Sequence, residues 1–221
     1  MTNFWRVVVL FIIIFAAYNA YADPPKVDVP EPVVVEEKFD VKTADRSVVR
    51  ITNLKGEFVA TGFYAGNDTI VTNYHVVEGN EHMLVWNEYK QVALGTVKYT
   101  DQKQDVATMT LSNNKLNLKA VTFSTDRPAR GETVYMVGAP AGLDWSLSIG
   151  YVMRKPGTWE VKDMVVGLVS MAGTGGSSGS PIFDHKGHVI GVTSMMFRIG
   201  DGLMYIPNHM FVKKIELEPA E

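Results

Sequence analysis

The sequence contains no cysteine among its 221 residues. This absence excludes disulfides, zinc sites with cysteine ligands and catalysis by a cysteine nucleophile. An excess of positive charge is also absent, because the chain has 21 basic and 24 acidic residues and a net charge of -3. Without a basic stripe, we expect no nucleic acid partner. Hydrophobic residues make up 46% and charged residues 20% of the chain, a balance typical of a globular protein with a real core.

Long hydrophobic runs are missing except near the N-terminus. There, VVVLFIIIFAA gives an apolar run of about eleven residues between MTNFWR and Ala20-Tyr21-Ala22. This layout predicts a secretory signal peptide over residues 1–22, cleaved after Ala22. The alternative is an uncleaved anchor, for which the run is short, since a spanning helix needs about 20 apolar residues. We expect an exported protein, periplasmic or extracellular, with no stable membrane span after cleavage.

Helical periodicity is also scarce. Residues 23–44 are rich in proline and acidic residues, which predicts an extended, mobile tether. About a dozen short segments rich in Val, Ile, Thr and aromatic residues follow, punctuated by Gly, Asn and Asp. Because no helices alternate with them, the pattern favours β-barrels or a β-sandwich. His185-Lys186-Gly187 is typical of a hairpin turn, and PNHMFVKKIEL, residues 207–217, suggests the one helix.

Three local patterns carry residues with catalytic chemistry: IVTNYHVV with His75, QDVATMTL with Asp105, and GTGGSSGSP with Ser178. Each has an ordinary explanation when taken singly, namely a structural histidine, a turn aspartate and a flexible Gly/Ser linker. Asp101 is the nearest rival of Asp105, but Asp105 leads directly into an apolar strand. The sequence after GTGGSSGSP disfavours a linker, because PIFDHKGHVIGVTSMM follows directly and is typical of a hairpin in a protein core.

The three patterns fit together as a nucleophile, its base and a residue that orients the base. Glycines beside Ser178 allow backbone conformations that other residues avoid, which suits a turn that exposes a hydroxyl. The chain order His, Asp, Ser belongs to the chymotrypsin-type double barrel, whereas other triad hydrolases use other orders. We therefore predict a triad of His75, Asp105 and Ser178. Residues 45–120 would form the barrel with His75 and Asp105, and residues 121–221 the barrel with Ser178 and a short C-terminal helix.

At these motifs the chain resembles trypsin-like serine proteases, and among them the HtrA/Deg type of bacterial envelopes. TNYHVV, QDVATMTL and GGSSGSP are similar to its His, Asp and Ser motifs. Residues 137–152 and 202–210 are similar to the opening hairpin and the closing strand of its second barrel, and the resemblance covers roughly residues 45 to 215. It implies two six-stranded antiparallel β-barrels and a serine endopeptidase that acts on polypeptides, without a cofactor or metal.

The resemblance also implies finer features of the site. Backbone N–H groups of Gly176 and Ser178 would form the oxyanion hole. The base of the specificity pocket would be Ala172, and its wall would comprise Ser194, Met195 and Met196. Because this pocket holds no charge, we expect cleavage after small or medium apolar residues, although Met195 and Met196 are also readily explained as core residues.

The sequence departs from the family pattern at three places. Ser180 stands where glycine is usual. Ser177 stands where digestive relatives carry an acid that pairs with a freed N-terminus, so activation by that route is not expected. HtrA-type proteins usually carry C-terminal PDZ modules, and about ten residues after the helix start are too few for one, so none is expected here.

Two other functional readings stay open. The first is a protease-fold binding or chaperone-like module whose triad is idle. The second is a structural β-barrel protein with an incidental Gly/Ser loop, which the order of the three motifs disfavours. A homo-oligomer also stays open, since related proteins are often trimeric but no residue here decides it. His185 and His188 are spaced as H-x-x-H across a predicted turn, and we expect no metal there.

Overall fold

The computed structural model describes residues 38–57, 60–112, 116–159, 163–197 and 202–214. The predicted signal peptide, residues 1–22, and residues 23–37 of the predicted tether lie outside these described residues. None of the helices in the described part has the length and apolar composition that crossing a membrane requires.

Six antiparallel strands in the first half of the chain close into a barrel. They are β1 (Val48–Thr52), β2 (Ala60–Gly66), β3 (Thr69–Thr72), β4 (His82–Trp86), β5 (Val92–Asp101) and β6 (Val106–Leu111). Their order around the barrel is β1-β2-β3-β6-β5-β4. β4 shows why these residues form strands, because buried and half-buried positions alternate along it with the period of two that a pleated strand imposes.

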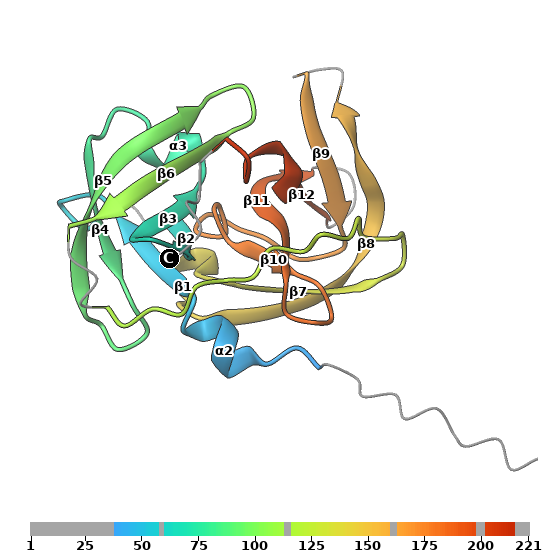
Figure 1. Ribbon diagram of the computed structural model, residues 1–221, viewed down its shortest axis with the longest axis horizontal. Helices are drawn as coiled ribbons and strands as arrows, with labels where there is room; N and C mark the ends of the chain where they lie inside the picture. Colours follow the sequence, from blue (N-terminus) through green and yellow to red (C-terminus); the bar gives the residue numbers. More distant parts are fainter. Residues whose placement is uncertain (1–37, 58–59, 113–115, 160–162, 198–201, 215–221) are drawn as a thin grey trace, which may run out of the picture. The chain divides into compact units, whose positions relative to one another are not determined.

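Six further strands form a second closed barrel. They are β7 (Thr133–Gly138), β8 (Ser146–Trp159), β9 (Met164–Val169), β10 (Pro181–Phe183), β11 (Val189–Phe197) and β12 (Gly202–Pro207). Their order, β10-β11-β12-β9-β8-β7, is that of the first barrel when it is read from β7. The two barrels lie side by side in Figure 1. The predicted chymotrypsin-like double barrel is therefore confirmed, and the two halves repeat one topology without an evident repeat in sequence.

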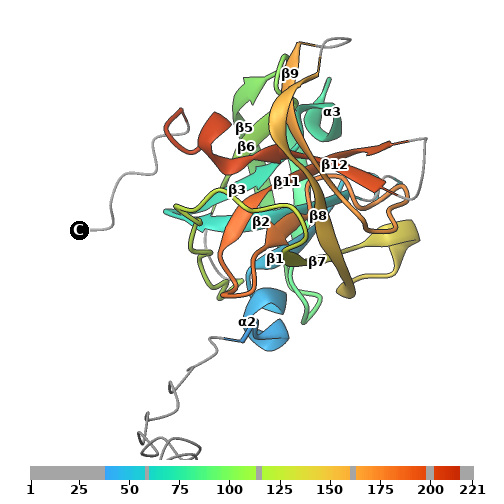
Figure 2. The same ribbon diagram turned by 90° about the vertical axis from the view of Figure 1, so that its right-hand side faces the viewer.

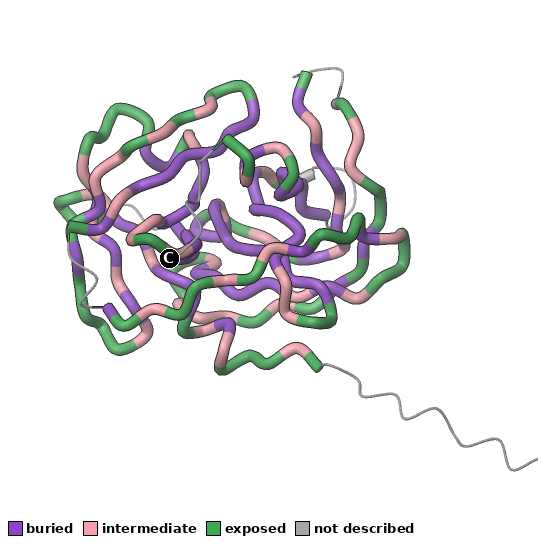
Figure 3. Tube along the Cα trace, in the orientation of Figure 1, coloured by how far each residue is buried: buried purple, intermediate pink, exposed green. Residues whose placement is uncertain are grey.

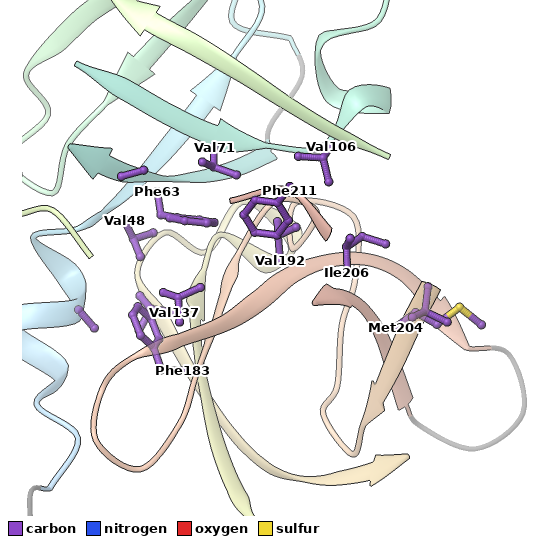
Figure 4. Packing of buried hydrophobic residues seen from close by; sticks show 14 of the residues in the cluster. Val48, Phe63, Val71, Val106, Val137, Phe183, Val192, Met204, Ile206 and Phe211 are labelled. Atoms are coloured by element: carbon purple, nitrogen blue, oxygen red, sulfur yellow. The ribbon is translucent and has the colours of Figure 1, made fainter. Parts of the chain in front are cut away.

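A hydrophobic cluster joins the two barrels. Phe63 and Val71 from the first barrel meet Val192 and Ile206 from the second, and all four are fully buried (Figure 4). Each barrel also has an interior cluster of its own. The buried positions accordingly follow the strands, while the connecting turns are mostly exposed (Figure 3). Burying this apolar surface is the main favourable term that holds the barrels together.

The chain segment before the first barrel is folded back on the second barrel. A short helix, α2 (Val41–Asp45), is capped by Asp40, whose side chain accepts hydrogen bonds from Lys42 N and Thr43 Oγ1. Phe39 stacks on Tyr135 of β7 with ring centroids 4.3 Å apart. Figure 2 shows α2 next to the β1 and β7 end of the barrels. The predicted extended tether is thus wrong for residues 41–44, which are helical, because Phe39 stacks on an aromatic partner and Asp40 caps the helix.

The hairpin between β10 and β11 turns where it was predicted. Asp184 Oδ1 accepts hydrogen bonds from the backbone N–H groups of Lys186 and His188, both at 2.9 Å. Gly187 has φ +81°, a left-handed conformation that glycine adopts without strain. Both effects close the turn tightly and bring β10 directly against β11.

The expected C-terminal helix starts at the predicted place. Pro207 ends β12 and precedes a 3₁₀ turn, η2 (Asn208–Met210). Within the described residues the helix is limited to this turn and the turns up to Lys214, where Phe211 N and Val212 N both donate to Asn208 O. Residues 215–221 of the predicted segment lie outside the described part of the chain.

Candidate active site

His75 lies on a one-turn helix, α3 (Tyr74–Val77), directly after β3. Val76 and Val77 are buried in the interior cluster of the first barrel, so His75 is turned outward and its side chain is 39% exposed. Asn73 precedes the helix in an extended conformation, and its Nδ2 donates to Asp105 O at 2.9 Å. The turn that carries His75 is thereby tied to the turn that carries Asp105.

Asp105 sits between β5 and β6 and is 8% exposed. Its backbone has φ +54°, in the left-handed region that aspartate tolerates better than most residues. Both carboxylate oxygens lie 2.9 Å from His75 Nδ1, and Oδ1 also accepts from His75 N at 3.0 Å. Because an ionised carboxylate can only accept, Nδ1 carries a proton, and in the neutral ring Nε2 is then the nitrogen that can accept one.

The pKa of Asp105 is lowered from its ordinary value. Burial acts in the opposite direction and raises the pKa, but hydrogen bonds from His75 and Ser194 lower it by more. The carboxylate therefore stays charged at neutral pH. A charged Asp105 stabilises a histidine that has taken up a proton, which is the state a general base reaches during catalysis.

Ser194 on β11 connects the two barrels at this point. Its hydroxyl donates to Asp105 Oδ2 at 2.5 Å, and its carbonyl oxygen lies 3.5 Å from Ser178 Oγ as the acceptor of that hydroxyl. Sequence reasoning placed Ser194 in the specificity pocket wall and missed its hydrogen bond to Asp105. A serine inside a β-strand gives no local signal for such a role, since the partner lies 89 positions away in the chain.

The loop before β10 presents Ser178. Gly176 has φ +100° and Gly179 has φ +84°, and a Cβ at these positions would collide with Ala139 O and Thr61 O respectively. Neither the N–H of Gly176 nor that of Ser178 donates a hydrogen bond to any of the described residues. Gly175 O, in contrast, accepts from Ala141 N at 2.7 Å. Two unpaired donors beside a serine hydroxyl are the arrangement that binds a developing oxyanion.

The structure brings the predicted catalytic residues to one place, with one gap. His75 and Asp105 are in direct contact, and Ser178 reaches them through Ser194. In the described part of the chain, no hydrogen bond joins Ser178 Oγ to His75. Catalytic hydrogen bonds are often long or poorly aligned in the absence of substrate, so a missing Ser178–His75 hydrogen bond is compatible with the predicted roles.

An open cleft of about 460 Å³ runs beside these residues. The first barrel contributes Tyr74, His75, Glu78, Gln102, Lys103 and Asp105 to its walls, and the second contributes Met164, Ser194 and Met195. Met195 thus lines the cleft, while Met196 is 58% exposed and Ala172 is exposed, both outside these walls. Sequence reasoning missed Met164 and Lys103, because the start of β9 and the turn before β6 meet only in the folded chain.

Metal ligands are not grouped in this region. Across the described residues, no three or more His, Asp or Glu side chains lie together as a bound metal ion requires. The groups that this site offers for chemistry are the His75 imidazole, the Asp105 carboxylate, the Ser178 hydroxyl and the N–H groups of Gly176 and Ser178.

Comparison with known proteins places the fold in a family. The family model described as a trypsin-like peptidase domain matches residues 60–192, more than half of the chain. Two similar curated proteins are both named "probable periplasmic serine endoprotease DegP-like". The one from Bartonella henselae is 30% identical over 167 residues, and the one from Halomonas elongata is 33% identical over 150 residues. These alignments cover 73% and 66% of this chain but 32% and 31% of the relatives, so the chain spans about a third of their length.

Solved structures agree with the fold. The HtrA-type protease AlgW with a tripeptide has a TM-score of 0.70 at 18% identity and covers 80% of this chain and 62% of its own. The active form of the Rv3671c protease from M. tuberculosis has a TM-score of 0.69 at 22% identity, covering 82% and 85%. At these identities the likeness concerns the fold alone. Together with the matched family model, it confirms the predicted resemblance, and the chain belongs to the trypsin-like peptidase domain family.

Proposed function

We propose that this protein is a serine endopeptidase with His75, Asp105 and Ser178 as its catalytic triad. The observation that carries the proposal is that Ser194 bonds to both Asp105 and Ser178 while Asp105 holds His75, with the N–H groups of Gly176 and Ser178 unpaired among the described residues. Family membership and the names of the periplasmic relatives support the same reaction class.

In this proposal each group has one step. Ser178 Oγ attacks the peptide carbonyl carbon while His75 Nε2 takes its proton, and Asp105 holds the ring and stabilises the imidazolium. The N–H groups of Gly176 and Ser178 bind the oxyanion of the tetrahedral intermediate. The C–N bond then breaks as His75 returns the proton to the leaving amine, and water releases the acyl group from Ser178 by the same route. Losing one such N–H donor costs about 3 kcal/mol of transition-state stabilisation.

The substrate in this proposal is an unstructured polypeptide with a small or medium apolar residue before the scissile bond. Ala172, at the predicted pocket base, carries no charge. Gly173 beside it has no room for a side chain, because a Cβ there would collide with Leu203. Residues further upstream in the peptide would lie in the cleft, where Met164 and Met195 offer an apolar wall.

Export to the periplasm or cell exterior completes the proposal. It rests on the N-terminal sequence pattern and on the relatives that are named periplasmic. N-terminal sequencing of the protein recovered from a fractionated bacterial host tests it. A mature chain that begins at Asp23 in the periplasmic fraction is the expected result, and an intact N-terminus in the cytoplasm would contradict it.

Proteolysis itself is tested with unfolded casein and a mixture-based peptide library, analysed by mass spectrometry. The purified full chain should cleave both, with alanine, valine or similar residues before the cut, and Ser178→Ala should cleave neither. Cleavage that persists in Ser178→Ala would contradict the proposed nucleophile. Cleavage after lysine or arginine would contradict the proposed pocket.

One observation favours the second candidate function, a binding or chaperone-like module with an idle triad. Ser178 Oγ points to Ser194 O at 3.5 Å instead of making a hydrogen bond with His75. A folded chain that binds unfolded casein but leaves every library peptide intact would support this second candidate.

A further inference from the structure

Thr61 is a buried residue of β2 whose N–H and hydroxyl form hydrogen bonds with the second barrel. It is fully inaccessible to solvent. Its N–H donates to Ser178 O at 2.9 Å, and its hydroxyl donates to Gly176 O at 2.8 Å. The same hydroxyl oxygen accepts from Ala139 N at 3.0 Å. Its carbonyl accepts from Thr72 Oγ1 at 2.8 Å, so no polar group of Thr61 lacks a partner.

These bonds hold the two residues whose N–H groups are assigned to the oxyanion hole. Thr61 holds the carbonyl of Gly176 and the carbonyl of Ser178, which are the residues that carry those N–H groups. The peptide plane of the Ser178 N–H is held by Ser180 N, which donates to Ser177 O at 3.1 Å. The peptide plane of the Gly176 N–H is held by Ala141 N, which donates to Gly175 O at 2.7 Å. Thr61 reaches this support too, because it binds Ala139 at the start of the same loop.

The hydroxyl of Thr61 is needed because it both donates and accepts at one point. A valine has almost the same shape but would leave Gly176 O and Ala139 N buried without partners, at a cost for each group. Gly176, with φ +100°, has no side chain of its own to resist a rotation of its peptide planes. Without the hydroxyl, those planes are free to turn the N–H away from the oxyanion.

We infer that Thr61 is a positioning residue that fixes the oxyanion hole from the opposite barrel. The inference rests on the proposed peptidase function and deepens it. Thr61 lies in the first barrel, and Gly176, 115 positions further along, lies in the second. The geometry of the oxyanion hole therefore depends on how the two barrels dock, in addition to the sequence of the loop itself.

The test compares Thr61→Val, Thr61→Ser and Thr61→Cys in the full chain. Thr52→Val is the matched control, since Thr52 is also a buried threonine with a side-chain hydrogen bond, from Trp86 Nε1 at 3.2 Å, but is not part of the site. The measurements are the second-order rate of fluorophosphonate labelling and the separate kcat and KM for a peptide cleaved by the wild type.

Thr61→Val should lower the labelling rate and kcat by about tenfold or more, because the oxyanion donors are misplaced. KM should change by less than about twofold, since the loss falls on the transition state. Thr61→Ser should restore both rates to within about threefold, and Thr61→Cys, a weaker donor of similar volume, should lie between. Thr52→Val should match the wild type at temperatures where it is folded.

Wild-type kcat in Thr61→Val or, if that variant does not fold, in Thr61→Cys would overturn the inference. So would a Thr61→Ser variant as slow as Thr61→Val, because the hydroxyl would then be irrelevant. An active wild type with unaffected Thr61 variants would remove only this inference. A folded wild type that neither labels nor cleaves any peptide would remove the proposed function together with it.

Discussion

At the scale of single residues, Ser180 lowers the free energy of unfolding because its buried hydroxyl has no partner among the described residues. It is fully buried behind the Ser178 loop, next to Gly138, and its hydroxyl makes no hydrogen bond with any of the described residues. A buried hydroxyl without a partner costs roughly 1 to 3 kcal/mol. We therefore expect Ser180→Ala to raise the free energy of unfolding by about 1 kcal/mol or more, as measured by denaturant titration.

The matched control for this stability prediction is Ser47→Ala. Ser47 is equally buried, but its hydroxyl donates to Thr43 O at 3.2 Å. The same chemical change should therefore lower the free energy of unfolding there. Equal destabilisation in both variants would show that Ser180 has a partner in solution.

The lowered pKa of Asp105 has a consequence for acid stability. Hydrogen bonds from His75 and Ser194 to the ionised carboxylate outweigh its burial and lower the pKa in the folded state. The stabilisation is therefore complete above the ordinary aspartate pKa, and it is lost as the pH falls through the lowered folded-state pKa. The difference in unfolding free energy between the wild type and Asp105→Asn should shrink as the pH is lowered through that window. A difference that is constant with pH would contradict this account.

The contact between His75 and Asp105 was predictable, because both residues, like Ser178, lie in short motifs whose order along the chain is informative. Thr61 and Ser194 were not predictable, since each acts on a residue that is distant in sequence. In the sequence, Thr61 is typical of a β-branched strand residue, and Ser194 is typical of a polar residue on an apolar strand. Their roles arise from docking between barrels, which local residue patterns do not encode.

At the scale of elements, the glycines before Ser178 differ sharply from one another. Gly176 has φ +100° and no room for a Cβ beside Ala139 O, whereas Gly175 has neither constraint. Gly176→Ala should lower kcat/KM by about 100-fold or more, because it displaces the N–H that we propose as an oxyanion donor. Gly175→Ala should retain activity to within about tenfold. A similar loss of kcat/KM in both variants, measured on one cleaved peptide, would contradict this account, because any added side chain in the loop would then lower activity.

The strands were predicted well because β-branched and aromatic residues between turn residues give a strong local signal. The N-terminal helix α2 was missed for a physical reason. The segment before it is rich in proline and acidic residues, and the prediction extended this composition up to residue 44. The stacking of Phe39 on Tyr135 and the cap at Asp40 are specific contacts that an average composition does not reveal.

At the scale of the whole molecule, ion pairs that cross between the barrels differ in exposure. Arg50 of β1 pairs with Asp144 at 3.0 Å, and these side chains are 32% and 26% exposed. Lys103 pairs with Asp163 at the rim of the cleft, where the side chains are 63% and 72% exposed. Because solvent screens exposed charges, the first pair should contribute more to barrel docking.

A double-mutant cycle measures this difference. The pair Arg50→Met and Asp144→Asn should give a coupling energy of about 1 kcal/mol in unfolding free energy, and Lys103→Met with Asp163→Asn a value near zero. High salt should leave the first coupling largely intact. A larger coupling for the exposed pair would contradict the assignment of Arg50 and Asp144 to the barrel interface.

The central claim is that the folded double barrel presents Ser178 as an activated nucleophile. The most direct measurement is fluorophosphonate labelling of the purified, folded chain, with the modified residue identified by mass spectrometry, in the wild type, Ser178→Ala and Ser177→Ala. The account predicts labelling at Ser178 in the wild type and in Ser177→Ala, and none in Ser178→Ala. A folded wild type that stays unlabelled, or a label on another serine, would contradict the claim and favour a binding module with an idle triad.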